Sequence, residues 1–222
     1  MWNNYFYNIQ KKYSMRVSLK EPLVIRLDGK NITKNKDINL MNLSSDKSFM
    51  YAMEKSVEHF TDKYKCLALY GSDEVSFIIE NPKLLMEDLD SDADNHSNEI
   101  ISLFSQYFFH YFNNFDKNKL VFFHAKCFSI PKEKIISYIK YRSRTIENVM
   151  VTYFLKRNNA NNEKLKLDEK IAKCKEMDNY YMIDKNKNGI LYYNGKQILI
   201  DEFLKGKVVY VKNIEEQFSD LF

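Results

Sequence analysis

The sequence predicts an α+β fold whose first elements follow the order strand, helix, strand, hairpin, strand. Two continuous apolar runs, residues 23–25 and 66–69, have the length and composition of buried strands. A third run, residues 75–79, resumes a β pattern directly after an acidic pair. Because a helical segment lies between the first two runs, the first half of the chain has the element order of an α+β domain.

Two of these segments carry a carboxylate next to a glycine. Residues 24–30 read V-I-R-L-D-G-K and residues 69–77 read L-Y-G-S-D-E-V-S-F, which places Asp28, Asp73 and Glu74 at strand ends or in a tight hairpin. If the strands are neighbours, Asp28 and Asp73 converge, and Mg²⁺ often takes one or two carboxylates plus substrate phosphates as ligands. Asp-Gly and Gly-Ser-Asp are also common turn sequences. The occurrence of both, with a helix between them, favours a metal site.

The rest of the chain predicts further helices and short strands. The expected elements are a buried helix at residues 100–115, a strand at 122–130, a basic helix at 135–155, an Asn-rich linker at 158–162, a Lys/Glu-rich helix at 163–176, and short β runs at 190–193 and 207–211. Residues 87–99 are acidic and polar without an apolar period, which predicts a mobile connection. His124 lies in an apolar strand and is expected to be a buried histidine.

Composition favours a soluble intracellular protein over a membrane or secreted one. The 222 residues are 45% hydrophobic and 15% aromatic, enough for one sizeable core or for a domain with a smaller appendage. No apolar run approaches the length of a membrane span, and the first residues lack the pattern of a signal peptide. Cys66, Cys127 and Cys174 are isolated and lack metal-binding spacing, so we expect thiols in a reducing compartment, the cytoplasm.

The first half of the chain also carries a connected set of short motifs. They are R-L-D-G-K-N at residues 26–31, Asp46 ahead of a helix that contains Met53, and S-D-E at residues 72–74 followed by S-F. This set resembles the tRNA(His) guanylyltransferase family, whose pattern is R-L-D-G-R-x-F, then K-P-x-D before a helix, then S-D-E-x-S-F. The resemblance is strongest over residues 22–79 and is weaker to the end of the chain, through F-H-A-K at 123–126 and L-K-G-K-V-V at 204–209.

The resemblance implies a ferredoxin-like polymerase or cyclase palm, β-α-β-β-α-β, with additional C-terminal helices and short strands. Residues 1–130 would form the catalytic palm, and residues 131–222 a helical and β part packed on it, or the whole chain one compact domain. The implied activity is nucleotidyl transfer with two Mg²⁺ ions per active site. Asp28 and Asp73 would bridge the ions with the Gly29 carbonyl as a further ligand, and Glu74 would complete or orient the site.

The resemblance also implies how the nucleotides bind and react. The backbone of residues 29–33 would cradle a triphosphate. The residues expected to bind the nucleotide are Arg26, Asp28, Gly29, Lys30, Asn31, Ile32, Thr33, Asp46, Ser72 and Asp73. The 5′ monophosphate of a tRNA is activated with ATP, and the 3′-OH of an incoming nucleotide, expected to be GTP, displaces the activating group. Metal ions lower the pKa of that hydroxyl and neutralise charge at phosphorus, so no general base is required.

Basic residues concentrate between residues 117 and 157, the expected RNA surface of a chain whose net charge is only +4. Lys140, Arg142 and Arg144 fall together with two tyrosines in the predicted helix 135–155, and cationic and stacking groups suit an RNA backbone and unpaired bases. The same charge run is also typical of a solvated helix face, and the family resemblance favours RNA binding. Because the family members resembled here work as tetramers, we expect a homo-oligomer, a tetramer or a dimer.

Departures from the family pattern favour tRNA repair over strict tRNA(His) guanylylation. Residues 144–149, R-T-I-E-N-V, replace the H-I-N-N of the eukaryotic members, residues 43–44 replace K-P, and the acidic residues 87–99 stand where the family places phosphate-binding arginines and lysines. A template-dependent 3′-to-5′ repair polymerase therefore fits better. Two alternatives remain open. One is a cyclic-nucleotide synthase, because G-S-D-E resembles the G-G-D-E-F turn of diguanylate cyclases; the other is a non-enzymatic RNA-binding module.

Overall fold

The computed structural model describes residues 5, 6, 8, 20–30, 32, 49–89, 96–112, 121–160, 164–177, 180 and 187–211. The elements in chain order are β1 (Leu23–Gly29), α2 (Phe49–Tyr64), β2 (Leu67–Gly71), β3 (Glu74–Ile79), α3 (Lys83–Leu89), α4 (His96–Tyr111), β4 (Phe123–Ser129), η2 (Lys132–Lys134), α5 (Ile135–Arg157), α6 (Leu167–Lys175), β5 (Ile190–Tyr193), β6 (Lys196–Ile198) and α8 (Ile200–Phe203). None of the described helices is long and apolar enough to cross a membrane.

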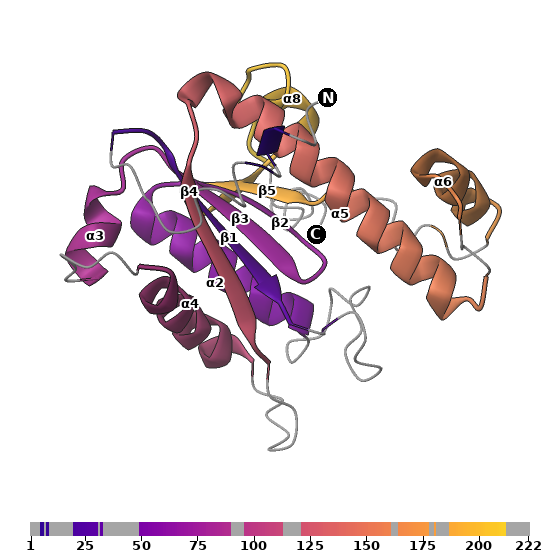
Figure 1. Cartoon of the computed structure of the whole chain (residues 1–222), viewed down its shortest axis with the longest axis horizontal. Coiled ribbons are helices and arrows are strands. Elements are labelled where there is room, and N and C mark those ends of the chain that lie inside the picture. Colours follow the sequence, from indigo (N-terminus) through magenta and orange to yellow (C-terminus); the bar gives the residue numbers. More distant parts are fainter. Residues whose placement is uncertain are drawn as a thin grey trace, which may run out of the picture.

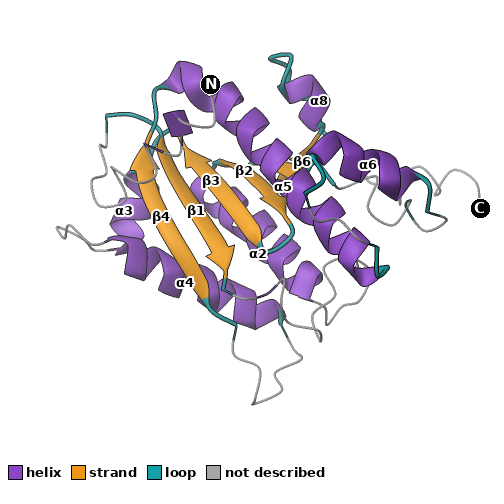
Figure 2. Ribbon diagram, turned by 45° about the vertical axis from the view of Figure 1, so that its right-hand side comes forward, coloured by secondary structure: helices purple, strands orange, loops and turns teal. Residues whose placement is uncertain are grey.

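The strands form one antiparallel sheet in the order β4-β1-β3-β2-β5-β6 (Figure 2). β1, α2, β2, β3, α4 and β4 give the β-α-β-β-α-β order of the ferredoxin-like palm, so the α+β prediction is confirmed. β1 lies between β4 and β3, which makes the strand with Asp28 a direct neighbour of the β2–β3 hairpin. β5 pairs with β2, so the C-terminal part of the chain continues the palm sheet.

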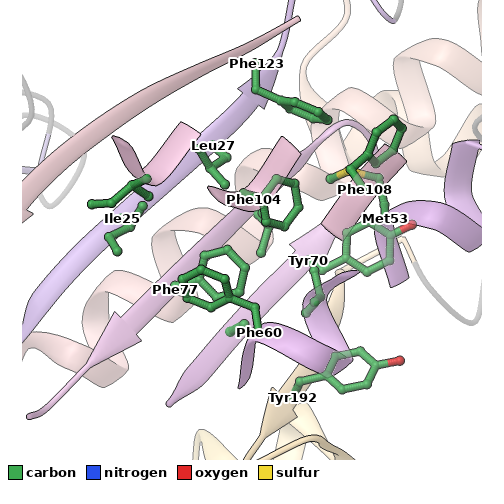
Figure 3. Close-up of a cluster of buried hydrophobic side chains, with 14 of the residues drawn as sticks. Ile25, Leu27, Met53, Phe60, Tyr70, Phe77, Phe104, Phe108, Phe123 and Tyr192 are labelled. Carbon is green, nitrogen blue, oxygen red and sulfur yellow. The ribbon is translucent and has the colours of Figure 1, made fainter. Parts of the chain in front are cut away.

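Alternation along the strands divides the core between the two faces of the sheet. On one face, Phe60 of α2 and Phe104 of α4 pack on Phe77 of β3, with ring centroids 4.2 Å and 5.8 Å from that of Phe77 (Figure 3). On the other face, the ring of Tyr138 in α5 lies 5.8 Å from that of Phe128 in β4. α5 therefore covers the face of the sheet opposite to α2 and α4 (Figure 1).

The prediction of a mobile acidic connection at residues 87–99 is wrong at both ends, because helices occupy them. α3 reaches into the segment and includes Asp88. Oδ2 of Asp88 accepts a hydrogen bond from the Tyr64 hydroxyl at 2.7 Å and lies 2.6 Å from Lys63 Nζ. α4 covers the last residues of the segment, and residues 90–95 lie outside the described part of the chain. These contacts of Asp88 with α2 stabilise α3. Because Tyr64 and Lys63 lie far from Asp88 in sequence, the local pattern of residues 87–99 does not reveal them.

The C-terminal strands follow the sequence expectation at the first run and differ at the second. The run predicted at residues 190–193 is β5, and Asn194 and Gly195, with φ of 51° and 77°, form the turn into β6. At the run predicted at 207–211 the structure has an isolated bridge from Tyr210 to β6 rather than a strand.

Candidate active site

The end of β1 and the β2–β3 hairpin bring two acidic residues together at one edge of the sheet. A two-residue turn, Ser72-Asp73, joins β2 to β3. In the β1–β3 pairing Asp28 is the Cα partner of Glu74, and the N–H of Gly29 donates to the carbonyl oxygen of Asp73 at 2.8 Å. The strand that carries Asp28 therefore lies directly beside the hairpin whose turn contains Asp73, which meets the condition for the two carboxylates to converge.

Asp73 is a buried acid that interacts with a second acid. Its exposed fraction is 8%, and burial, followed by the negative charge of Asp28, raises its pKa from 3.8 to about 6. The Ser72 hydroxyl donates to Asp73 Oδ1 at 3.0 Å, and Arg26 Nη2 donates to Asp28 Oδ2 at 2.8 Å. Both carboxylates are thus oriented by a neighbouring donor, and Asp73 retains an electrostatic penalty that a bound cation would offset.

The donor chemistry of this pair fits a hard divalent cation. Carboxylate oxygens of Asp28 and Asp73, together with a backbone carbonyl such as that of Gly29, are the ligands that Mg²⁺ uses in proteins. Across the described ranges, no three histidine, cysteine, aspartate or glutamate side chains are grouped to hold a metal ion. A bound ion would therefore take its other ligands from backbone, water and substrate phosphates, as Mg²⁺ commonly does.

Glu74 forms a buried ion pair with α5. Its side chain is 10% exposed and that of Arg142 is 4% exposed. Arg142 Nε donates to Glu74 Oε1 at 3.0 Å, and Arg142 Nη2 donates to Glu74 Oε2. Burial acts to lower the pKa of Arg142, yet the Glu74 carboxylate holds it above its ordinary value. The ion pair joins α5 to the first residue of β3.

The expectation that Lys140, Arg142 and Arg144 share one RNA-facing surface is wrong for Arg142. Residues 140 and 144 are one helical turn apart and both are exposed, whereas residue 142 lies between them on the buried side of α5. Arg144 is also engaged, because its guanidinium pairs with Glu147 Oε2 at 2.7 Å and with Asp168. The surface of α5 therefore retains Lys140 and Arg144 from the predicted set.

The triphosphate cradle expected at residues 29–33 has less free backbone than the sequence suggested. The N–H of Gly29 is bonded to Asp73, and the N–H of Lys30 donates to the carbonyl oxygen of Phe122 at 2.7 Å. Lys30 is exposed at its side chain, and Ile32 is 3% exposed. Three further residues of the predicted nucleotide site, Asn31, Thr33 and Asp46, lie outside the described residues.

Sequence reasoning missed two polar residues of β4 that border the acidic pair. His124 is the Cα partner of Asp28, and Lys126 is the Cα partner of Arg26. Direct partners in an antiparallel pair project from the same face of the sheet, and both β4 residues are exposed. The prediction of a buried His124 is therefore wrong. The alternation of apolar and polar residues in F-H-A-K-C, residues 123–127, was the sequence signal that could have placed His124 correctly.

A family model described as tRNAHis guanylyltransferase matches residues 4–131, more than half of the 222 residues of the chain. The chain belongs to the tRNA(His) guanylyltransferase family. β1 to β4, with Asp28, Asp73 and Glu74, lie inside the match, and the resemblance predicted from the motifs is confirmed. As a member of this family, the chain is a nucleotidyltransferase of tRNA processing, and the family is generally metal-dependent.

Solved structures related to the tRNA(His) guanylyltransferase family share the fold of the chain. A bacterial tRNA(His) guanylyltransferase-like protein in complex with GTP is 15% identical, with a TM-score of 0.56 over 99% of this chain and 95% of that chain. Such a protein in complex with ATP is 16% identical, with a TM-score of 0.58 over 97% and 92%. The enzyme from Saccharomyces cerevisiae is 19% identical, with a TM-score of 0.50 over 87% and 95%. A search among curated proteins found no match.

Gly29 allows the turn with Asp73 to approach β1 in this tRNA(His) guanylyltransferase family member. A Cβ built on Gly29 would lie 2.5 Å from Ile32 Cγ1 and 3.2 Å from Asp73 Cβ. Gly29→Ala is therefore expected to displace Asp73 from Asp28, lower nucleotide addition by about tenfold or more, and destabilise the fold by about 1–3 kcal/mol. Rates of RNA extension and thermal unfolding measure the two effects.

Gly206→Ala is the matched control for this prediction. Gly206 has a φ of +84°, so alanine is strained there, but no atom lies within 4 Å of its Cβ position. The control should lose stability by about 1 kcal/mol and keep its activity. Equal losses of activity in the two variants would contradict a specific role for Gly29 at the site.

Proposed function

We propose that the chain adds nucleotides to the 5′ end of a tRNA in the 3′-to-5′ direction, as a template-dependent repair polymerase that uses GTP and ATP. The observation that carries this proposal is the juxtaposition of Asp28 and Asp73 across neighbouring strands of a palm in this family. The bacterial proteins solved with GTP and with ATP have the same fold, which supports the choice of nucleotides.

Asp28 and Asp73 would hold two Mg²⁺ ions, with the carbonyl of Gly29 as a further ligand. Bound Mg²⁺ would lower the pKa of an attacking hydroxyl and neutralise charge at phosphorus. The residues of the chain supply the orientation. Arg26 holds the Asp28 carboxylate and the Ser72 hydroxyl holds Asp73, so both ligands are fixed before substrate binds.

The nucleotide would lie beside the end of β1. The exposed ammonium group of Lys30 is placed to meet the triphosphate, and Arg26, Ile32 and the hydroxyl of Ser72 lie around the same edge. Asn31, Thr33 and Asp46 remain proposed members of this site. Because the N–H groups of Gly29 and Lys30 are bonded within the fold, we assign phosphate binding chiefly to side chains.

The reaction consists of two transfers at phosphorus. An oxygen of the RNA 5′ phosphate first attacks the α-phosphorus of ATP, and pyrophosphate leaves. The 3′-hydroxyl oxygen of GTP then attacks the activated 5′ phosphorus, AMP leaves, the hydroxyl proton passes to water, and the RNA carries the triphosphate of GTP at its new 5′ end. Each step requires in-line positioning and charge neutralisation, which the acidic pair and its cations would supply.

α5 supports tRNA repair over strict tRNA(His) guanylylation. Residues 144–149 replace the H-I-N-N of the eukaryotic members, and within this stretch Glu147 is 6% exposed and paired with Arg144. With Ile146 at the isoleucine of that motif, Thr145 stands at the place of the histidine, and its hydroxyl donates to the carbonyl oxygen of Tyr141 at 3.0 Å. A threonine hydroxyl bonded within the helix cannot make the contacts of an imidazole, and this difference supports the proposal of tRNA repair.

The exposed face of α5 is the proposed RNA surface, with Lys140 and Arg144 as phosphate contacts. Replacement of both by methionine is expected to weaken tRNA binding while ATP binding is unchanged. The slope of the logarithm of the tRNA binding constant against the logarithm of salt concentration should become shallower by about 0.7 to 0.9 per lost contact. Lys205→Met, which removes an exposed lysine paired with Glu202, is the control. Unchanged tRNA affinity in the double variant, measured across a salt series, would identify this side of α5 as a solvated surface.

The decisive assay is incubation of the protein with labelled ATP or GTP and a 5′-monophosphorylated, 5′-truncated tRNA, with and without Mg²⁺. A Mg²⁺-dependent longer RNA whose added nucleotides complement the opposite strand supports the proposal. A cyclic nucleotide, or RNA retention without product, would support the synthase or the binding module instead. We also propose a homo-oligomer, a dimer or a tetramer, and a monomer by light scattering at micromolar concentration would contradict that part.

A further inference from the structure

α5 contacts the hairpin of Asp73 on both sides of its turn. After the turn, Arg142 binds the carboxylate of Glu74. Before the turn, Ile146 packs so closely on Gly71 that a Cβ built there would lie 2.5 Å from Ile146 Cγ2. Residues 142 and 146 are one helical turn apart, so a single face of α5 holds the two ends of the hairpin.

The ion pair with Arg142 engages both carboxylate oxygens of Glu74 inside the protein. Oε1 accepts a hydrogen bond from Arg142 Nε and Oε2 accepts one from Arg142 Nη2, and both side chains are buried. A cation that displaced Arg142 from Glu74 would leave the guanidinium charge buried and uncompensated, which is strongly unfavourable. Asp28 and Asp73 have no comparable partner on α5.

The turn between Gly71 and Glu74 requires such support. Ser72 has a φ of 57°, a left-handed conformation that is unfavourable for a non-glycine residue. Asp73 is buried beside the charge of Asp28, and turning outward would relieve both burial and repulsion. Contacts at both ends of the turn oppose this movement.

We propose that Arg142 and Ile146 clamp the catalytic hairpin, that Arg142 is a positioning residue acting through Glu74, and that Glu74 binds Arg142 and not the metal. The inference rests on the proposed function, because it assumes that Asp28 and Asp73 hold the ions. It assigns to α5 a second role, on the side of the helix opposite to the proposed RNA surface. It also replaces the RNA contact predicted for Arg142.

Metal binding, measured without turnover, separates ligands from positioning residues. Mn²⁺ is used as the probe, and its affinity is followed by electron paramagnetic resonance. Asp73→Asn is expected to weaken Mn²⁺ binding by more than about tenfold, whereas Glu74→Gln is expected to stay within about threefold of the parent. If Glu74→Gln loses Mn²⁺ as completely as Asp73→Asn, Glu74 is a ligand and the inference fails. If Asp28→Ala and Asp73→Asn both bind Mn²⁺ normally, the proposed metal site itself fails.

Activity measurements test whether Arg142 acts through Glu74. Arg142→Met should lower kcat at saturating Mg²⁺ and nucleotides by about 10–100-fold, and Arg142→Lys should recover part of the loss. The double variant Glu74→Met/Arg142→Met removes both buried charges and guards against misfolding of the single variants, which thermal unfolding would reveal. Its kcat should be no lower than that of the slower single variant. Losses that multiply in the double variant would show that the two residues act independently.

Lys132→Met is the matched control. Lys132 Nζ pairs with Glu80 Oε2 at 2.7 Å, and both side chains are exposed. Lys132 lies in η2 just before α5, and Glu80 follows the last residue of β3, so this ion pair links the start of α5 to the end of β3 that is remote from the hairpin turn. The variant should retain kcat and Mn²⁺ affinity. A loss equal to that of Arg142→Met would mean that any weakening of the α5–β3 contact lowers activity, and would overturn a specific clamp at the hairpin.

Discussion

Asp28→Ala and Asp73→Ala are each expected to abolish nucleotide addition while the protein stays folded. Asp28 lies at the end of β1 with its side chain 40% exposed, and the alanine variant loses a charged group rather than packing. Asp73 is buried, but its ionised form is disfavoured in the fold, so its removal does not cost stability. A loss of about a thousandfold or more in the rate of RNA extension is expected, because the proposed metal ligands disappear.

Asp201→Ala is the control for both variants, since Asp201 is an exposed acid in the short helix α8. It should extend RNA at the rate of the parent. The three variants are compared at saturating Mg²⁺ and nucleotide after their circular dichroism spectra have been matched. Near-normal extension by either the Asp28 or the Asp73 variant would refute the two-carboxylate assignment.

Asp73→Asn is expected to stabilise the metal-free protein while it removes activity. Asparagine keeps an Oδ1 acceptor for the Ser72 hydroxyl but carries no charge to be buried or repelled by Asp28. A pKa raised from 3.8 to about 6 corresponds to about 2–3 kcal/mol at neutral pH, so the melting temperature in EDTA should rise by about 4–10 °C. Most substitutions of a buried polar residue lower the melting temperature, whereas this one is expected to raise it.

The same prediction has a defined pH dependence. The pKa of Asp73 is higher in the folded state than in the unfolded chain. Between pH 3.8 and about 6, the folded protein therefore keeps a proton on Asp73 that the unfolded chain has lost. The stability of the parent protein falls as pH rises through this window. The advantage of Asp73→Asn should be absent below about pH 4 and complete above about pH 6. Mg²⁺ should raise the melting temperature of the parent and not that of the variant. Equal responses to Mg²⁺ would argue against a metal at Asp73.

The elements that the sequence placed correctly are those whose signal is local. The apolar runs of β1 and β2 and the motif around Asp73 each specify a strand or a turn from adjacent residues. The approach of Asp28 to Asp73 then follows from strand pairing, which the β-α-β-β order of the palm makes the natural arrangement. The hairpin and its neighbour strand were therefore predictable together.

The features that the sequence misplaced depend on which side of an element a residue faces. Arg142, Lys140 and Arg144 are all basic and close in sequence, which suggests one common surface. The helical period instead puts Arg142 on the side of α5 that faces the sheet, where it forms an ion pair with Glu74. The N–H of Lys30 was assigned to a phosphate, but a carbonyl of the segment before β4 occupies it. In both cases the bonding partner is distant in sequence, and a local motif does not identify it.

Because β2 pairs with β5, the sheet is complete only after β5 has been synthesised. Leu67 to Tyr70 are paired with residues 190–193, so the hydrogen-bonding edge of β2 stays open while the nascent chain passes through β4 and α5. Apolar residues fill this edge, and an open edge of this kind is a template for association with other chains. A palm truncated after residue 130 is therefore expected to aggregate, and in the cell the interval before β5 emerges is when the protein most needs a chaperone.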